Sequence, residues 1–316
     1  MSALPFLPAH QLAVQPAERR WLIEALWGEE AVGIVGGEPK CCKSFLALDM
    51  AVAVASGKPC LRQFTVGRPG RVVLFAAEDA LHVVRQRLDG ICRAVGMALA
   101  EIDVQVITAP SVRLDLEQDR KALAETIEEL QPRLLILDPF VRLHRVDENL
   151  SGEVGPLLAF LRELQRQFHL AVVLVHHARK GAGKERAGQA LRGSSEFHAW
   201  GDSNLYVRVK GNTVLLAIEH RTAASISGVV LDVRISDGRV SLAAADRTGA
   251  AEEPAATVPQ LLTPIERIQQ ALAAADGPRS LKQLRTTCRM RTESLCEALA
   301  TLKSQGRVVL DTTVYR

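Results

Sequence analysis

A short segment near residue 40 has the composition of a loop that binds phosphate. Gly37 begins it, Lys43-Ser44 end it, and the apolar run Ala31–Val35 precedes it directly. Where such a loop opens a helix, its backbone N–H groups surround phosphates, the lysine reaches the β- and γ-phosphates, and the serine hydroxyl ligates Mg²⁺. We therefore expect ATP to be bound by Gly37, Glu38, Pro39, Lys40, Cys41, Cys42, Lys43, Ser44 and Phe45.

One position of this loop departs from the usual pattern, because Cys42 stands where a glycine is expected before the lysine. A Cβ and a thiol there crowd a backbone that must approach phosphate closely. Two alternatives therefore stay open, a chance resemblance and a loop that has lost nucleotide binding. Cys41 and Cys42 are expected to fill the loop and not to bind a metal, since no second ligand pair accompanies them.

Carboxylates follow two further apolar runs. Leu134–Leu137 leads to Asp138, and Arg71–Ala76 leads to Glu78 and Asp79. Ligands of open α/β sheets bind at the carboxyl ends of the strands, so Asp138 is placed to hold Mg²⁺ together with the loop serine. Glu78 is expected to orient and deprotonate the attacking water, while Asp79 caps the next helix. Alone, any buried strand that ends in Asp gives such a pattern by chance.

Histidines and basic residues follow a third apolar run, Ala171–Val175. His177 falls where a sensor of the γ-phosphate would be needed, and a purely structural role is the alternative. Metal binding by His176 and His177 is not expected, because adjacent strand residues point to opposite faces. Residues 179–192 contain five basic residues and one acidic residue. They form either a solvated loop or a contact with a nucleic-acid backbone.

The elements that must position these residues alternate along the chain. Continuous apolar strands separated by amphipathic helices are typical of a parallel sheet covered on both faces. The expected strands are Ala31–Val35, Arg71–Ala76, Val104–Thr108, Leu134–Leu137 and Ala171–Val175. The expected helices are Lys43–Ala55, Ala80–Val95, Asp119–Leu130 and Ser151–Phe168, with a short helix-like stretch at Trp21–Trp27.

From Asn204 the pattern changes to strands of period two, which predict an antiparallel extension at the edge of the sheet. These strands are Leu205–Val209, Val214–Glu219, Val229–Ile235 and Val240–Ala243. Arg221 ends the second of them, as an ordinary surface arginine or as one offered to the ATP of a neighbouring subunit.

The sequence at the end of the chain indicates a separate module. Residues 245–263 are rich in Ala, Pro, Glu and Thr without periodicity, which indicates a linker. Three short helices and a hairpin-like segment then predict a winged helix-turn-helix in residues 264–316. This part carries nine Lys/Arg and five Asp/Glu, as expected for duplex DNA binding, although such modules also dock proteins. The basic residues placed to meet DNA are Lys282, Arg285, Arg289 and Arg291.

Composition narrows the class of protein. The chain has 316 residues, of which 47% are hydrophobic and 24% are charged. This composition is close to that of globular proteins and excludes a disordered tail protein. The six cysteines form no CxxC pair and are expected to be reduced thiols in a cytoplasmic protein. No signal peptide or membrane span is visible. We expect an ATPase domain at 1–244, a linker at 245–263 and the winged-helix module at 264–316.

These motifs together resemble the RecA-like ATPases of the RepA type, the family of plasmid replicative hexameric helicases, and more distantly the DnaB and RadA group. The resemblance covers about Trp21 to Ala243 and is carried by GEPKCCKSFLALDMA, FAAED, LLILDP, VVLVHHARK and ALRGSSEFHAWGD. It implies an α/β RecA-like core with Glu78 as base and Asp138 in the Mg²⁺ shell. It also implies His176 and His177 as γ-phosphate sensors that signal to DNA.

The resemblance further implies single-stranded DNA contact by the loop at 179–192 and a hexamer. It assigns Arg221 as an arginine finger that acts across the subunit interface. The family's usual Lys-x-Arg pattern reads Glu219-His220-Arg221 here, so the lysine partner is replaced.

Two functions from different classes follow. The first is a DNA-associated, oligomeric, helicase-like ATPase in replication or mobile-element maintenance. The second is an ATP-switched DNA-binding regulator or adaptor with weak hydrolysis, which the altered loop and the C-terminal module favour. A scaffold with a vestigial core accounts least well for the retained site residues.

Overall fold

The computed structural model describes residues 6–12, 20–177, 196–211, 213–236 and 239–245, then 264–273, 277–288 and short stretches between 295 and 315. The chain divides into two compact units, residues 1–247 and 248–316, each with an apolar core of its own. The expected linker beyond Ala245 and the basic loop at 179–192 lie outside the described residues.

The larger unit is built on one nine-stranded sheet with the order β11-β10-β9-β8-β3-β7-β6-β4-β5. Parallel pairing runs from β8 to β5, and antiparallel pairing joins β8, β9, β10 and β11. The strands are β3 (Val32–Gly37), β4 (Val72–Ala76), β5 (Val104–Val106), β6 (Leu134–Asp138), β7 (Ala171–His177), β8 (Ser203–Lys210), β9 (Thr213–His220), β10 (Ile226–Ser236) and β11 (Arg239–Ala244).

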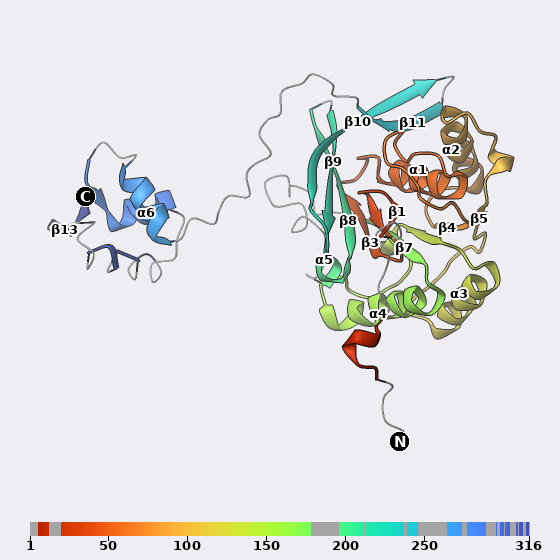
Figure 1. Cartoon of the computed structure of the whole chain (residues 1–316), viewed down its shortest axis with the longest axis horizontal. Coiled ribbons are helices and arrows are strands. Elements are labelled where there is room, and N and C mark those ends of the chain that lie inside the picture. Colours follow the sequence, from red (N-terminus) through yellow and green to blue (C-terminus); the bar gives the residue numbers. More distant parts are fainter. Residues whose placement is uncertain are drawn as a thin grey trace. The chain divides into compact units, whose positions relative to one another are not determined.

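Helices cover both faces of this sheet, as the continuous apolar strands predict. The helices are α1 (Lys43–Ser56), α2 (Leu81–Ala94), α3 (Glu117–Leu130), α4 (Ser151–Phe168) and α5 (Glu196–Trp200). Residues of α1 and α2 form one apolar cluster with the sheet, and residues of α3 and α4 form the other (Figure 1). The expected α/β class with a large, mostly parallel sheet is confirmed, and α4 spans the very residues that its periodicity indicates.

The expected antiparallel extension at the edge of the sheet is confirmed, because β8, β9, β10 and β11 pair antiparallel in turn and β11 ends the strand order. β8 joins this extension to the parallel part of the sheet, since it also pairs parallel with β3. One expectation about this unit is wrong. The stretch Trp21–Trp27 is no helix but the strands β1 (Trp21–Ile23) and β2 (Trp27–Gly28). Ala25 adopts a positive φ of 54° between them, which turns the chain back and prevents a helix.

The smaller unit contains the first two expected helices and the expected hairpin, while most of the third helix lies outside the described residues. Helical residues also occur at 295, 298–299 and 301–303, and Arg285 is exposed. β12 and β13 both pair antiparallel with β14. The elements with printed bounds are α6 (Pro264–Ala273), β12 (Arg279–Ser280), α7 (Leu281–Cys288), β13 (Leu310–Asp311) and β14 (Val314–Tyr315). Arg289, Arg291 and the side chain of Lys282 lie outside the described part.

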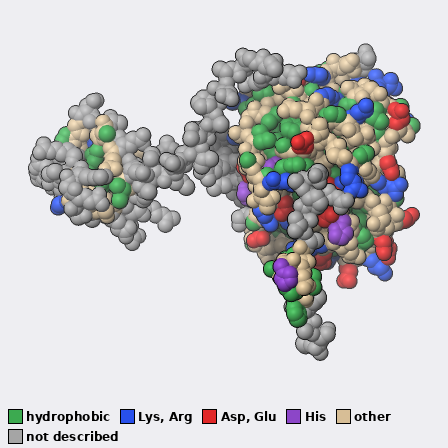
Figure 2. All heavy atoms as spheres, viewed as in Figure 1, with side chains coloured by type: hydrophobic (Ala, Val, Ile, Leu, Met, Phe, Trp, Pro, Cys, Tyr) green, Lys and Arg blue, Asp and Glu red, His purple; other side chains and the backbone are tan. Residues whose placement is uncertain are grey.

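Charged side chains of both signs are interspersed on the face of the larger unit seen in Figure 2. This agrees with the nearly balanced charge of the chain before residue 264. Among the described residues, no helix is both long and apolar enough to cross a membrane.

Candidate active site

Four neighbouring parallel strands bring the predicted chemistry to one edge of the sheet. The loop after β3 and the residues that end β7, β6 and β4 border a pocket of about 390 Å³. These strands are adjacent, so their carboxyl ends open on the same crevice, where ligands of such sheets bind. The pocket is lined by Pro39, Lys40, Cys41, Cys42, Lys43, Ser44, Phe45, Glu78, Asp79, Arg87, Asp138, Pro139 and His177.

The loop backbone explains why glycine is usual where this chain has Cys42. Cys42 immediately precedes α1 and adopts φ 70° and ψ 19°, in the left-handed region. Lys40, two residues earlier, also has a positive φ of 64°. These conformations curl the chain around the N-terminus of α1, whose first N–H groups have no partner within the helix. The loop therefore keeps a phosphate-binding shape although its usual glycine is absent.

Gly37, at the end of β3, is required by close packing. A Cβ there would lie 2.3 Å from the carbonyl oxygen of Val207 on β8 and 2.7 Å from Sγ of Cys41. Cys41 is buried and fills the space under the loop, as expected. Burial raises the pKa of its thiol, which keeps the sulfur protonated and uncharged.

Lys43 curls back over the loop that it ends. Its side chain is almost fully buried, and Nζ donates a hydrogen bond of 2.7 Å to the carbonyl oxygen of Glu38. The ammonium lies 3.8 Å from Sγ of Cys41. The positive charge is thus held inside the pocket by the loop backbone, where an anion would meet it.

Ser44 and Asp138 meet through a side-chain hydrogen bond between the start of α1 and the end of β6. Burial and the neighbouring Asp79 and Glu78 raise the pKa of Asp138 to about 6, although Ser44 and Lys43 lower it. A cation that binds beside such a carboxylate stabilises its ionised form, which burial otherwise disfavours. The pair matches the hydroxyl and carboxylate oxygens that Mg²⁺ prefers.

The two acids after β4 have different partners. Glu78 is 44% exposed and accepts a hydrogen bond of 2.8 Å from Nε of Arg142. Asp79 forms an ion pair with Arg87 of α2, whose guanidinium lies 5.1 Å from the ring centroid of Phe45. The expectation that Asp79 caps α2 is wrong, because Ala80 is the N-cap residue and makes no side-chain capping bond.

Arg87, which lines the pocket, and Arg142, which pairs with Glu78, are two residues that the sequence did not predict. Arg87 lies about two helical turns after Asp79, on the face of α2 that is directed toward the acids. That spacing could have predicted the ion pair. Arg142 follows the Asp138 strand in the short 3-10 helix η4 (Phe140–Arg142). Its pairing with Glu78 depends on β6 and β4 being neighbours in the sheet, which the local sequence does not predict.

The two histidines that end β7 point in opposite directions, as the strand period requires. His177 borders the pocket. His176 is 2% exposed and packs against the ring of Phe197 from α5 at 4.4 Å. Its Nε2 lies 3.4 Å from Glu148.

Glu148 lies between His176 and a second histidine, His144, whose Nε2 is also 3.4 Å away. Burial alone would raise the pKa of Glu148, but the two histidines beside it outweigh burial and lower the pKa to about 2. His176 is thus part of a buried cluster behind the pocket and does not border it directly. The cluster ties β7 to the segment that leads into α4.

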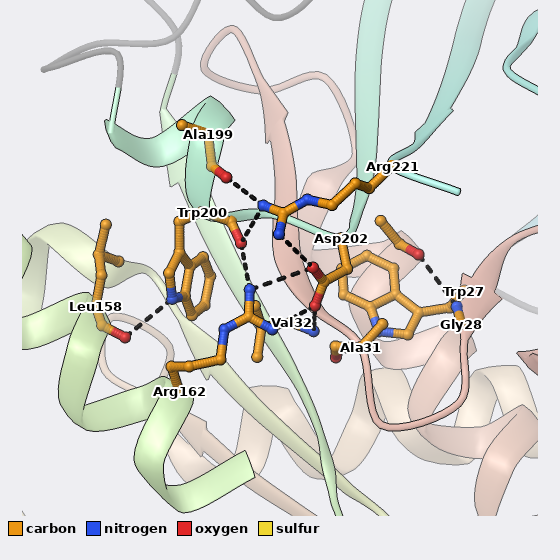
Figure 3. A network of polar contacts seen from close by, with 11 residues as sticks. Trp27, Gly28, Ala31, Val32, Leu158, Arg162, Ala199, Trp200, Asp202 and Arg221 are labelled. Atoms are coloured by element: carbon orange, nitrogen blue, oxygen red, sulfur yellow. Dashed lines mark hydrogen bonds and ion pairs between the residues drawn. The ribbon is translucent and has the colours of Figure 1, made fainter. Parts of the chain in front are cut away.

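Arg221 lies at the opposite end of the sheet from the loop of its own subunit. It follows β9, whose last residue, His220, pairs with Ser203, and Ser203 pairs with Gly33 near the start of β3. The loop begins at the other end of β3, where Gly37 pairs with Val207. Arg221 therefore cannot reach the pocket of its own subunit. Figure 3 shows its guanidinium among Ala199, Trp200 and Asp202.

Comparison with known proteins agrees with this architecture. A family model described as "AAA domain" matches residues 1–183, more than half of the chain. The chain belongs to this AAA domain family. The matched range contains the loop at 37–45, Glu78, Asp138 and His177.

One solved structure with a similar fold is described as a DnaB-like replicative helicase and its interactions with primase. The similarity has a TM-score of 0.52 at 13% sequence identity and covers 67% of this chain. It covers 57% of the helicase chain, so this protein spans little more than half the length of that neighbour. The similarity shows a shared fold.

Proposed function

We propose that this AAA domain protein is an ATPase of the RepA type that couples ATP binding and hydrolysis to DNA. The observation that carries the proposal is the convergence of Lys43, Ser44, Glu78, Asp138 and His177 on one pocket at the carboxyl edge of the sheet. A buried ammonium, a hydroxyl–carboxylate pair and a partly exposed carboxylate are the groups that phosphoryl transfer to water requires.

The residues present fit a nucleoside triphosphate with Mg²⁺. The N-terminus of α1 and the ammonium of Lys43 would bind the phosphates, and the ring of Phe45, which borders the pocket, would pack beside them. Ser44 and Asp138 would hold Mg²⁺, which when bound supplies positive charge to the phosphate oxygens.

Glu78 is the proposed general base, and the hydrogen bond from Arg142 orients its carboxylate until water is in place. His177 contacts the γ-phosphate side of the pocket and reports its occupancy through β7. Arg221 is proposed to act in trans, because it lies at the far end of the sheet from the pocket of its own chain. The protein is accordingly a ring, a hexamer by the family resemblance.

DNA is the proposed partner of two parts of the chain. The basic segment 179–192 follows directly on His177 and contacts single-stranded DNA. Residues 264–316 form a winged helix that binds duplex DNA, a proposal supported by their order of helices and strands and by their positive charge. The proposed role is a helicase-like motor in replication or mobile-element maintenance.

A specific observation favours a second function, an ATP-switched DNA-binding regulator or adaptor with weak hydrolysis. Cys42 holds a backbone conformation that costs a non-glycine residue about 1–2 kcal/mol, and its thiol borders the pocket. A weakened phosphate loop suits a protein that binds ATP but hydrolyses it slowly.

Steady-state ATPase measurements with and without single-stranded and duplex DNA separate these functions. Strong stimulation by single-stranded DNA is expected for the motor. Nucleotide binding without turnover would favour the switch, and the absence of nucleotide binding would overturn both proposals.

The roles within the pocket are tested by two substitutions and one control. Glu78→Gln keeps the size and removes the base, so turnover is expected to fall about 10²–10⁴-fold while ATP still binds. Lys43→Ala is expected to weaken ATP binding itself, because the charge that faces the phosphates is lost. Glu129→Gln, at an exposed position of α3, is the control and should change neither. Normal hydrolysis by Glu78→Gln would move the base elsewhere, with Asp79 as the next candidate.

A further inference from the structure

The guanidinium of Arg221 is held at one defined place in the subunit. Its NH2 group donates to the carbonyl oxygens of Ala199 and Trp200 at the end of α5, and its NH1 group lies 3.3 Å from Oδ1 of Asp202. An arginine side chain has many rotamers, and these three contacts select one of them. The side chain nevertheless stays 50% exposed, so one side of it still faces solvent.

Asp202 is itself fixed by contacts from two other elements. Arg162 of α4 donates hydrogen bonds from both terminal nitrogens to its carboxylate, and it also donates to the carbonyl oxygen of Trp200. The backbone N–H of Val32, at the start of β3, donates to Oδ2 at 3.3 Å. Figure 3 shows the carboxylate between the two guanidinium groups. Asp202 therefore connects Arg221 to the helix layer and to the sheet.

The charges of this cluster do not cancel. Two guanidinium groups share one carboxylate, which leaves one net positive charge, and the carbonyl oxygens at the end of α5 offset it only in part. The excess charge lies on the half-exposed side of Arg221 and not on Arg162, whose side chain is only 20% exposed. A polyanion that approached this edge would meet an arginine already oriented.

We propose that Asp202 is a positioning residue, which holds Arg221 in the orientation that serves the ATP of a neighbouring subunit, with Arg162 holding Asp202 in turn. The inference rests on the proposed role of Arg221 in trans and adds the residues that make it effective. Charge placed in advance of the reaction stabilises the transition state more than charge that must first be ordered. Losing Asp202 should thus affect turnover and spare ATP binding.

The test begins with Asp202→Asn, which removes the charge and keeps the size. We expect kcat to fall about ten- to hundredfold with the KM for ATP little changed, because a misplaced catalytic group costs that much. Glu163→Gln is the matched control, because Glu163 is an exposed residue of α4 next to Arg162. It should retain the wild-type kcat.

Mixed oligomers then show whether Asp202 acts through Arg221 across the interface. An Asp202→Asn subunit has an intact pocket, so it should regain turnover when surrounded by an excess of Lys43→Ala subunits, which supply correctly held arginines. The double variant Asp202→Asn/Arg221→Ala should be no slower than Arg221→Ala alone. No recovery in mixtures that still assemble, or a further loss in the double variant, would show that Asp202 acts elsewhere and overturn the inference.

The outcomes separate this inference from the proposed function. Full turnover by Arg221→Ala would overturn the role in trans and with it the role of Asp202. A slow Arg221→Ala beside a normal Asp202→Asn would overturn the positioning role alone. If Asp202→Asn does not fold, Asp202→Glu carries the same test, because it keeps the charge and shifts its position. A reduced kcat supports the inference, and a wild-type kcat overturns it.

Discussion

At the scale of single residues, Cys42 shows how a conformation can persist without the residue type that usually provides it. The loop requires a left-handed backbone just before α1, and Cys42 adopts it with φ 70°. The neighbouring thiol of Cys41 is buried beneath the loop and packs against the Cα of Gly37, which supports this shape from below. Cys42 itself lines the pocket.

Cys42→Gly is expected to raise nucleotide affinity or turnover about two- to tenfold, because it removes the Cβ and the thiol from the surface that phosphate approaches. Titration with a fluorescent ATP analogue and steady-state ATPase assays measure the two quantities. Cys42→Ala keeps the Cβ and is the matched control, so it should gain less. Unchanged or lower values for the glycine variant would show that the loop has adapted to the thiol.

At the scale of elements, the contact between β3 and β8 positions both the phosphate loop and the residues around Asp202. β3 carries the phosphate loop at its carboxyl end, and β8 begins beside Asp202 at the other end. The two backbones approach so closely that a Cβ at Gly33 would lie 1.7 Å from the carbonyl oxygen of Ser203. Asn204 adds a side-chain bond of 3.2 Å to the N–H of Ile34.

Gly33→Ala is therefore expected to lower the free energy of unfolding by about 3 kcal/mol or more, because two backbones must separate. Denaturant unfolding monitored by circular dichroism measures the loss. Gly152→Ala is the control, since a Cβ at this exposed position of α4 has nothing within 4 Å. It should leave stability unchanged or slightly higher. Equal stability of the two variants would contradict the role given to Gly33.

At the scale of the whole molecule, the chain consists of two units with separate cores. The larger unit, residues 1–247, buries two apolar clusters on the two faces of its sheet. The smaller unit has its own cluster, which includes Ile268, Leu284 and Leu302. None of the described residues of the pocket belongs to the smaller unit. The pocket and the proposed duplex-binding module thus lie in different units.

A fragment of residues 1–247 is expected to fold and to bind ATP with the affinity of the full chain, while its affinity for duplex DNA falls at least tenfold. Thermal unfolding, nucleotide titration and DNA binding at fixed salt measure these properties. A fragment that does not fold would show that the units depend on each other. Undiminished duplex binding would move the DNA contact into the larger unit.

The sequence by itself determined the elements of the core and the strand ends that carry its chemistry. The helix bounds of α4, the phosphate loop, and the acids and histidines after three apolar runs all follow from local periodicity and from turn residues. These features are readable because strand and helix periods, and the chemistry of a phosphate loop, are properties of consecutive residues.

Only the tertiary structure decided which strands are neighbours and which charges meet. Three features join residues that are far apart in the chain. They are the parallel pairing of β8 with β3, the pairing of Glu78 with Arg142, and the contacts of Arg221 and Arg162 with Asp202. The stretch at Trp21–Trp27 departs from its predicted helix for the same reason, since its strands pair with each other and the N–H of Gly28 in β2 donates to Ser203 of β8. Such contacts depend on the order of strands in the sheet, and no local pattern of residue types encodes that order.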